Sequence, residues 1–94
     1  MRIKWFRQAI LDLDRIEEYI AEDNAAAAVE VIVRIIDAVS LLKDQPGIGR
    51  PGRVPGTKEL VIPDLPYIVP YRVKEGMVQI LRIYHTSRKW PDRL

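Results

Sequence analysis

The sequence predicts a small α+β domain in which two helices pack on one face of an antiparallel sheet. Apolar residues recur at helical spacing through the first half of the chain, whereas apolar and polar residues alternate near its end. A stretch rich in proline and glycine separates the two halves. The predicted element order is β-α-α-β-β-β, within a single domain that spans residues 1–94.

The first elements are a short strand and an amphipathic helix. Residues 2–6 alternate in character and predict the opening strand. In the following segment, apolar residues fall on one side of a helical wheel and predict the buried side of the first helix; they are Ala9, Ile10, Leu13, Ile16 and Ile20. Leu11 lies on the opposite, acidic side and is expected to be exposed.

The second helix is predicted to begin after Asn24, a residue type that caps helix N-termini. It should run to about Lys43, before Pro46 ends it, and pack beside the first helix as a hairpin. Apolar side chains cover about half of its circumference, and Val33 and Leu41 fall at or within its polar stripe. Two interpretations stay open, a well-buried helix or a partner-binding surface, and we favour the buried helix.

The second half of the chain is predicted to form strands. Residues 46–57 are a long loop of proline and glycine. Three strands are expected after it, over residues 58–62, 67–74 and 77–85. Glu75-Gly76 is a hairpin signal between the last two strands. Pro70 lacks an N–H group and is therefore expected at an unpaired edge or a bulge.

A two-residue turn at Glu75-Gly76 assigns the side chains of the last two strands to two faces. The face assigned to the helices is richer in aromatic and branched residues and carries Tyr67, Val69, Tyr71, Val73, Val78, Ile80, Arg82 and Tyr84. The open face carries Ile68, Pro70, Arg72, Lys74, Met77, Gln79, Leu81, Ile83 and His85. Arg82 would then need a carboxylate from the first helix, and Glu17 or Asp14 is the expected partner.

Composition excludes several kinds of chemistry. The 94 residues contain no cysteine and one histidine, so thiol catalysis is excluded and neither a metal site nor a cofactor is expected. A net charge of +2 is weak for a protein held on nucleic acid by many phosphate contacts. The sequence has no signal-peptide pattern and no apolar run of membrane-spanning length. We therefore expect a cytoplasmic protein without membrane contact.

The order and spacing of several segments resemble the RelE/ParE toxin superfamily. These segments are Leu41–Pro51, Thr57–Val61, Pro66–Val73 and Ile80–Trp90. The resemblance implies a toxin encoded beside a small antitoxin, whose C-terminal segment wraps the toxin in a hetero-oligomer and neutralises it. It also implies one of two activities. RelE-like members cleave mRNA in the ribosomal A site without a metal, and ParE-like members inhibit DNA gyrase by binding.

The RelE-like activity would need a base, an acid and cations around the scissile phosphate. RelE-type nucleases typically carry an arginine after the tyrosine of the third strand, where this chain has Ile68. If the chain is nevertheless a nuclease, the catalytic residues are expected to be His85, Arg72 and Arg88 at the open sheet face, with Glu59 as a base. The alternative for His85 is a structural hydrogen bond at the sheet edge, and we favour that alternative.

The ParE-like activity agrees better with Ile68 and with the last strand, Ile80–His85. Target contact is then expected from Arg88, Lys89 and Trp90, although Trp90 could instead fold back over the sheet edge. The antitoxin is expected to cover apolar residues of the open face and the hairpin: Ile68, Leu81, Ile83, Leu11, Val33 and Leu41. Gyrase is the expected target. Ribosome-dependent mRNA cleavage is the first alternative, and a non-toxic binding module is the second.

Overall fold

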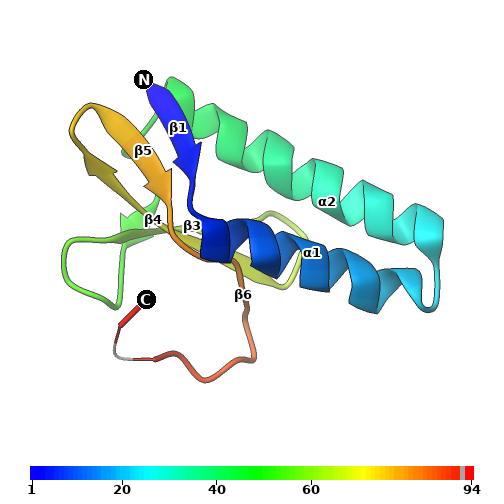
Figure 1. Ribbon diagram of the computed structural model, residues 1–94. Helices are drawn as coiled ribbons and strands as arrows, with labels where there is room; N and C mark the ends of the chain where they lie inside the picture. Colours follow the sequence, from blue (N-terminus) through cyan, green and yellow to red (C-terminus); the bar gives the residue numbers. More distant parts are fainter. Residues whose placement is uncertain (92) are drawn as a thin grey trace.

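The structure is a computed structural model that describes residues 1–91 and 93–94. Its elements are β1 (Arg2–Trp5), α1 (Arg7–Ala21), α2 (Ala25–Ser40), the short 3-10 helix η1 (Leu41–Lys43), β2 (Arg50–Pro51), β3 (Lys58–Val61), β4 (Tyr67–Lys74), β5 (Met77–Ile80) and β6 (Tyr84–His85). The α+β class and the order of the main elements are confirmed. Figure 1 shows the two helices side by side along the sheet, and the chain after β6 curling away from them.

The strands form one mixed sheet in the order β1-β5-β4-β3-β2, and β6 pairs with β4. β1 is parallel to β5, with Ile3 opposite Val78, whereas the other pairs are antiparallel. The expectation of a purely antiparallel sheet was wrong at this one pair. A parallel neighbour requires a long crossover connection, which the helices that follow β1 provide.

The second helix begins and ends where its sequence predicts. The Asn24 side chain accepts a hydrogen bond of 3.0 Å from the Ala27 N–H and so caps α2. At the other end, η1 continues the helical path to Lys43 before the proline and glycine loop. Among the described residues, no helix is long and apolar enough to cross a membrane.

The core lies between the helix hairpin and one face of the sheet. The helices contribute four fully buried side chains to it, from Ala9, Ile35, Val39 and Leu42. The sheet contributes branched and aromatic side chains, from Leu60, Tyr67, Val69, Tyr71, Val78, Ile80 and Ile83. The face richer in aromatic and branched residues therefore packs on the helices, as predicted for β4 and β5.

The last strand is interrupted by a bulge, and this changes the faces of the residues beyond it. The turn at Glu75-Gly76 has the predicted register, and pairing between β4 and β5 ends with Tyr71 opposite Ile80. Pairing resumes with Ile68 opposite Tyr84, so three residues of the last strand oppose two of β4. Pro70 lies at this interruption, as expected, because it has no N–H for the ladder.

Because of the bulge, three side chains lie on the opposite face of the sheet from the one predicted. Ile83, expected on the open face, is 3% exposed and belongs to the core between sheet and helices. His85, also expected on the open face, lies opposite Tyr67 and on the helix side of the sheet. Tyr84, expected on the helix side, lies opposite Ile68 on the other side. One inserted residue reverses the alternation of every side chain after it.

Part of the apolar surface of α2 is exposed, so the favoured expectation of a well-buried helix was only half right. One side packs in the core through Ile35 and Val39. The other side carries three exposed aliphatic residues at steps of four and three, Val29 (59%), Val33 (48%) and Ile36 (43%). This apolar stripe is accessible to a partner.

Candidate functional site

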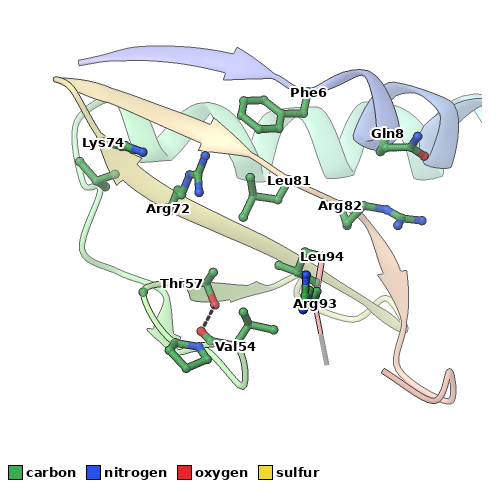
Figure 2. A pocket seen from close by; sticks show the side chains of 13 residues that line it. Phe6, Gln8, Val54, Thr57, Arg72, Lys74, Leu81, Arg82, Arg93 and Leu94 are labelled. Carbon is green, nitrogen blue, oxygen red and sulfur yellow. Dashed lines mark hydrogen bonds between the residues drawn. The ribbon is translucent and has the colours of Figure 1, made fainter. Parts of the chain in front are cut away.

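A basic groove of about 550 Å³ lies on the sheet face that points away from the helices. Figure 2 shows Arg72 and Lys74 rising from β4 at one end, with Leu81 between them and Arg82. Phe6, which lies between β1 and α1, and the loop 54–57 form its sides, and Arg93 reaches it from the chain after β6. No acidic side chain is among the described residues that line it, so it suits an anionic, partly apolar ligand.

Arg72 is held in this groove by its neighbours across the sheet. Its guanidinium donates a hydrogen bond to the side chain of Gln79, the residue opposite it on β5. It also lies over the Phe6 ring, 5.8 Å from the ring centroid. The groove therefore presents a positioned cation beside an aromatic surface.

Arg82 connects the groove to α1 through Asp12. Its Nε and Nη2 donate hydrogen bonds of 2.8 and 3.1 Å to the two carboxylate oxygens of Asp12. The Asp12 carboxylate also accepts a 2.9 Å bond from the Ile83 N–H and is 5% exposed. Hydrogen bonding to Asp12 raises the pKa of Arg82, although burial opposes this. The first helix supplies the carboxylate, as predicted, but the expected partners Glu17 and Asp14 were wrong.

Glu59 is buried and fully hydrogen-bonded, whereas a catalytic base needs access to its substrate. Its side chain is 1% exposed and lies opposite Pro70. Arg50 donates to one carboxylate oxygen at 3.1 and 3.2 Å, and the Arg53 N–H donates to the other at 2.8 Å. Both oxygens are therefore occupied in holding the proline and glycine loop against β3, which is unfavourable for proton abstraction.

Trp90 folds back onto the sheet. Its ring meets Tyr84 edge to face at 4.9 Å, and the guanidinium of Arg53 lies 4.1 Å from its centroid. Arg88 stacks on the Tyr84 ring at 4.5 Å, whereas Lys89 is exposed. Of the two expectations for Trp90, this arrangement agrees with a residue that covers the sheet edge.

His85 lies in a second cavity, the α1–β6 cleft, with a volume of about 290 Å³. Arg88 lines the same cleft, so these two predicted residues are brought together. Arg72 lines the basic groove on the other side of the sheet, and the expectation that it shares a face with His85 was wrong. The bulge before β6 is the physical reason, because it turns His85 towards α1.

The residues expected to contact the antitoxin differ in accessibility. Ile68, Leu81 and Ile83 were expected on an exposed open face, but they are 4%, 9% and 3% exposed, because other parts of this chain cover them. Val33 and Leu41, in contrast, are 48% and 55% exposed on the helix hairpin. Leu11, which was expected to be exposed, is half-buried, whereas Ile10, which was expected on the buried side of the first helix, is 46% exposed. Apolar contacts with a partner are therefore available mainly on the hairpin.

Several cleft residues were not predicted from the sequence. Asp12, Arg15 and Tyr19 project from one side of α1, and Tyr67 comes from the start of β4. A signal for the helical residues exists, since their spacing of three and four residues places them on one helix face. The sequence indicated an irregularity near Pro70, but not the register after it, which brings His85 to this side of α1.

Comparison with known proteins agrees with this fold. Residues 3–90 match the family described as the ParE toxin of the type II toxin-antitoxin system, parDE. Y4kP of Sinorhizobium fredii, whose name describes it as a candidate toxin, is 45% identical over 99% of this chain and 96% of its own length. Toxin RelE2 of Caulobacter vibrioides is 32% identical over 93% of this chain and 97% of its own. A solved chain of the chromosomal ParDE system of P. aeruginosa has a TM-score of 0.85 and 36% identity, with coverage of 93% of this chain and 97% of that one.

The fold and these relatives define the class, which is the RelE/ParE superfamily of type II toxin–antitoxin toxins. Within it, the chain belongs to the ParE toxin family. A toxin of such a system has an antitoxin as its partner.

Proposed function

We propose that this toxin inhibits DNA gyrase by binding it, without cleaving RNA. The observation that carries the proposal is the match of residues 3–90 to the ParE toxin family. Binding also agrees with the arrangement of charged groups, because the basic groove and the α1–β6 cleft present cations without a free carboxylate base. The protein would act in the cytoplasm, where gyrase is found.

His85 and Arg88 share the α1–β6 cleft, but the separation of Arg72 and Glu59 from them supports binding over RNA cleavage. A metal-independent ribonuclease needs its acid, its base and its phosphate-binding cations within reach of one phosphodiester. Here Arg72 and His85 line cavities on opposite sides of the sheet. Glu59, the remaining candidate base, has both carboxylate oxygens occupied by Arg50 and Arg53.

The antitoxin is proposed to neutralise the toxin by covering the helix hairpin. The apolar stripe of α2 (Val29, Val33 and Ile36) offers an i, i+4, i+7 pattern that fits the apolar side of an amphipathic helix. Leu41 extends the accessible apolar surface towards the end of the hairpin. Acidic residues elsewhere in the same antitoxin segment would be attracted to the basic groove.

Assays on the two possible targets test the proposal. The purified toxin should inhibit supercoiling by purified gyrase and should leave mRNA intact on translating ribosomes. Codon-dependent mRNA cleavage without gyrase inhibition would establish the RelE-like alternative. Expression of the toxin without its antitoxin should stop growth, whereas normal growth would indicate a non-toxic binding module.

A further inference from the structure

The α1–β6 cleft is lined by two arginines that form no ion pair with a described carboxylate. They are Arg15 of α1 and Arg88 of the turn after β6. The one acidic side chain of the cleft, Asp12, is engaged by Arg82 and by the Ile83 N–H. The side chains that line the cleft therefore carry a net positive charge, which favours the binding of an anionic group.

The remaining polar groups of the cleft are suited to donate hydrogen bonds. The His85 Nδ1 accepts a 3.1 Å bond from the Ser87 N–H, so a neutral ring carries its proton on Nε2. Burial, with a smaller contribution from Tyr19, raises the pKa of Tyr67, so its phenol stays protonated at neutral pH. The rings of Tyr67 and His85 meet edge to face at 5.5 Å, which brings both donors to the same wall.

The turn after β6 places Arg88 beside these donors. The Arg88 N–H donates to the His85 carbonyl at 3.0 Å and closes the turn. The Arg88 guanidinium is stacked on Tyr84, which limits the freedom of its long side chain. Less side-chain entropy is then lost when this guanidinium binds a ligand.

Size and charge indicate which anion the cleft fits. A volume of about 290 Å³ is at the lower limit of small-molecule pockets, roughly 300 Å³, so the cleft admits one side chain and little more. The chain's net charge of +2 is weak for binding a polymer of phosphates. Two arginines with neutral donors and an apolar floor of Ile16 and Ile83 match a carboxylate on an aliphatic stem.

We propose that the α1–β6 cleft binds a glutamate or aspartate side chain of the target protein, with Arg15 and Arg88 as its ion-pair partners. This inference rests on the proposed function, in which the toxin acts by binding a protein target. The cleft is distinct from the basic groove and shares no lining residue with it.

The test measures binding of the full-length toxin to gyrase in the absence of DNA, together with inhibition of supercoiling. Arg15→Gln and Arg88→Gln should each weaken binding by about tenfold, and the double variant by more, because each removes a charge-assisted contact. Tyr67→Phe removes only a hydroxyl and should weaken binding by a few-fold. The effect of the arginine variants should shrink as the salt concentration rises.

Lys43→Gln is the matched control, because it removes one positive charge from an exposed residue outside both cavities. It should bind gyrase as the wild-type toxin does. Unchanged affinity of the double arginine variant would overturn the inference while leaving gyrase inhibition by the wild type intact. A loss that appears only when DNA is present would also overturn it, because the cleft would then bind phosphate. Unchanged thermal midpoints exclude misfolding as the cause of any loss.

Discussion

Asp12 and Arg82 lie 70 positions apart in the chain, yet their side chains meet in a two-point ion pair. The pair is largely buried, with side-chain exposures of 5% for Asp12 and 15% for Arg82. The same carboxylate accepts a hydrogen bond from the Ile83 N–H, within the bulge. Asp12 thus fixes both a groove arginine and the irregular backbone that precedes β6.

Asp12→Asn should therefore destabilise the fold. The variant leaves the Arg82 guanidinium partly buried without a counter-charge, and we expect a loss of about 3 kcal/mol in the free energy of unfolding. Urea unfolding of both proteins measures this difference. Asp14→Asn is the control, because Asp14 is exposed on the same helix and should change stability by less than about 0.5 kcal/mol. Equal effects of the two variants would contradict a special role for the pair.

Tyr71→Phe should also lower the free energy of unfolding. The substitution keeps the ring in the core but removes hydrogen bonds between its hydroxyl and the loop at Pro46 and Gly49. The Tyr71 hydroxyl donates to the Pro46 carbonyl at 2.8 Å and accepts from the buried Gly49 N–H at 2.9 Å. Its loss leaves the Gly49 N–H unsatisfied, at a cost of about 2 kcal/mol. Gly49→Ala should be at least as damaging, since a Cβ there would lie 2.6 Å from the Tyr71 ring. Thermal or urea unfolding measures both, and a neutral Tyr71→Phe would show that the loop does not depend on this hydroxyl.

The fold class was predictable because its main signals are local. Helical periodicity, the Asn24 cap and the Glu75-Gly76 turn each depend on a few neighbouring residues, and all three are confirmed. The proline at position 70 indicated an irregularity, and the structure places the bulge there. Local sequence does not encode where pairing resumes after such an irregularity.

The candidate site was less predictable because it depends on that long-range register. The single extra residue after Ile80 moves His85 to the α1 side and Tyr84 to the other. A residue-by-residue alternation therefore placed Arg72 and His85 together, although they line different cavities. The choice of Asp12 over its acidic neighbours likewise depends on the tertiary approach of α1 to the bulge, which no helical wheel specifies.

Alkaline pH should destabilise the protein through its buried tyrosines. Burial raises the pKa of Tyr67 and Tyr71 above their ordinary value. Folding therefore favours their neutral forms. The contribution of these tyrosines to the free energy of unfolding is fully present below about pH 10 and is lost as the pH rises through the raised pKa values. Urea unfolding at about pH 8 and about pH 10.5 should show the decline. The free energy of unfolding of a Tyr67→Phe/Tyr71→Phe double variant should fall less over the same pH range. An equal fall would assign the effect to other groups.

Val33→Glu should separate the toxin from its antitoxin. The residue is 48% exposed at the centre of the apolar stripe, so folding should change by less than about 1 kcal/mol. A charge in the proposed contact should weaken antitoxin binding by roughly tenfold or more. Calorimetry with the purified antitoxin measures this, and co-expression should no longer rescue growth. Gln45→Glu, an exposed position outside the stripe, is the control. Full affinity of Val33→Glu would place the antitoxin elsewhere.

His85→Gln distinguishes a binding role from a catalytic one. Glutamine retains an N–H donor near the position of the imidazole Nε2 but cannot transfer a proton at neutral pH. A catalytic acid or base contributes about 10²- to 10⁴-fold in rate, and its loss would abolish toxicity. A residue that donates one hydrogen bond to a partner contributes far less, so we expect gyrase inhibition to fall by only about threefold to tenfold.

The measurement is the toxin concentration that halves supercoiling by gyrase, compared among the wild type, His85→Gln and His85→Ala. The alanine variant lacks both the donor and the side-chain bulk that packs against Tyr67, so in a binding mechanism it should be weaker than the glutamine variant. Equal and complete inactivation of both variants, together with RNA cleavage by the wild type alone, would assign His85 to catalysis. A graded loss instead places the imidazole among the contacts of the α1–β6 cleft, where Ser87 fixes its tautomer and Tyr67 its orientation.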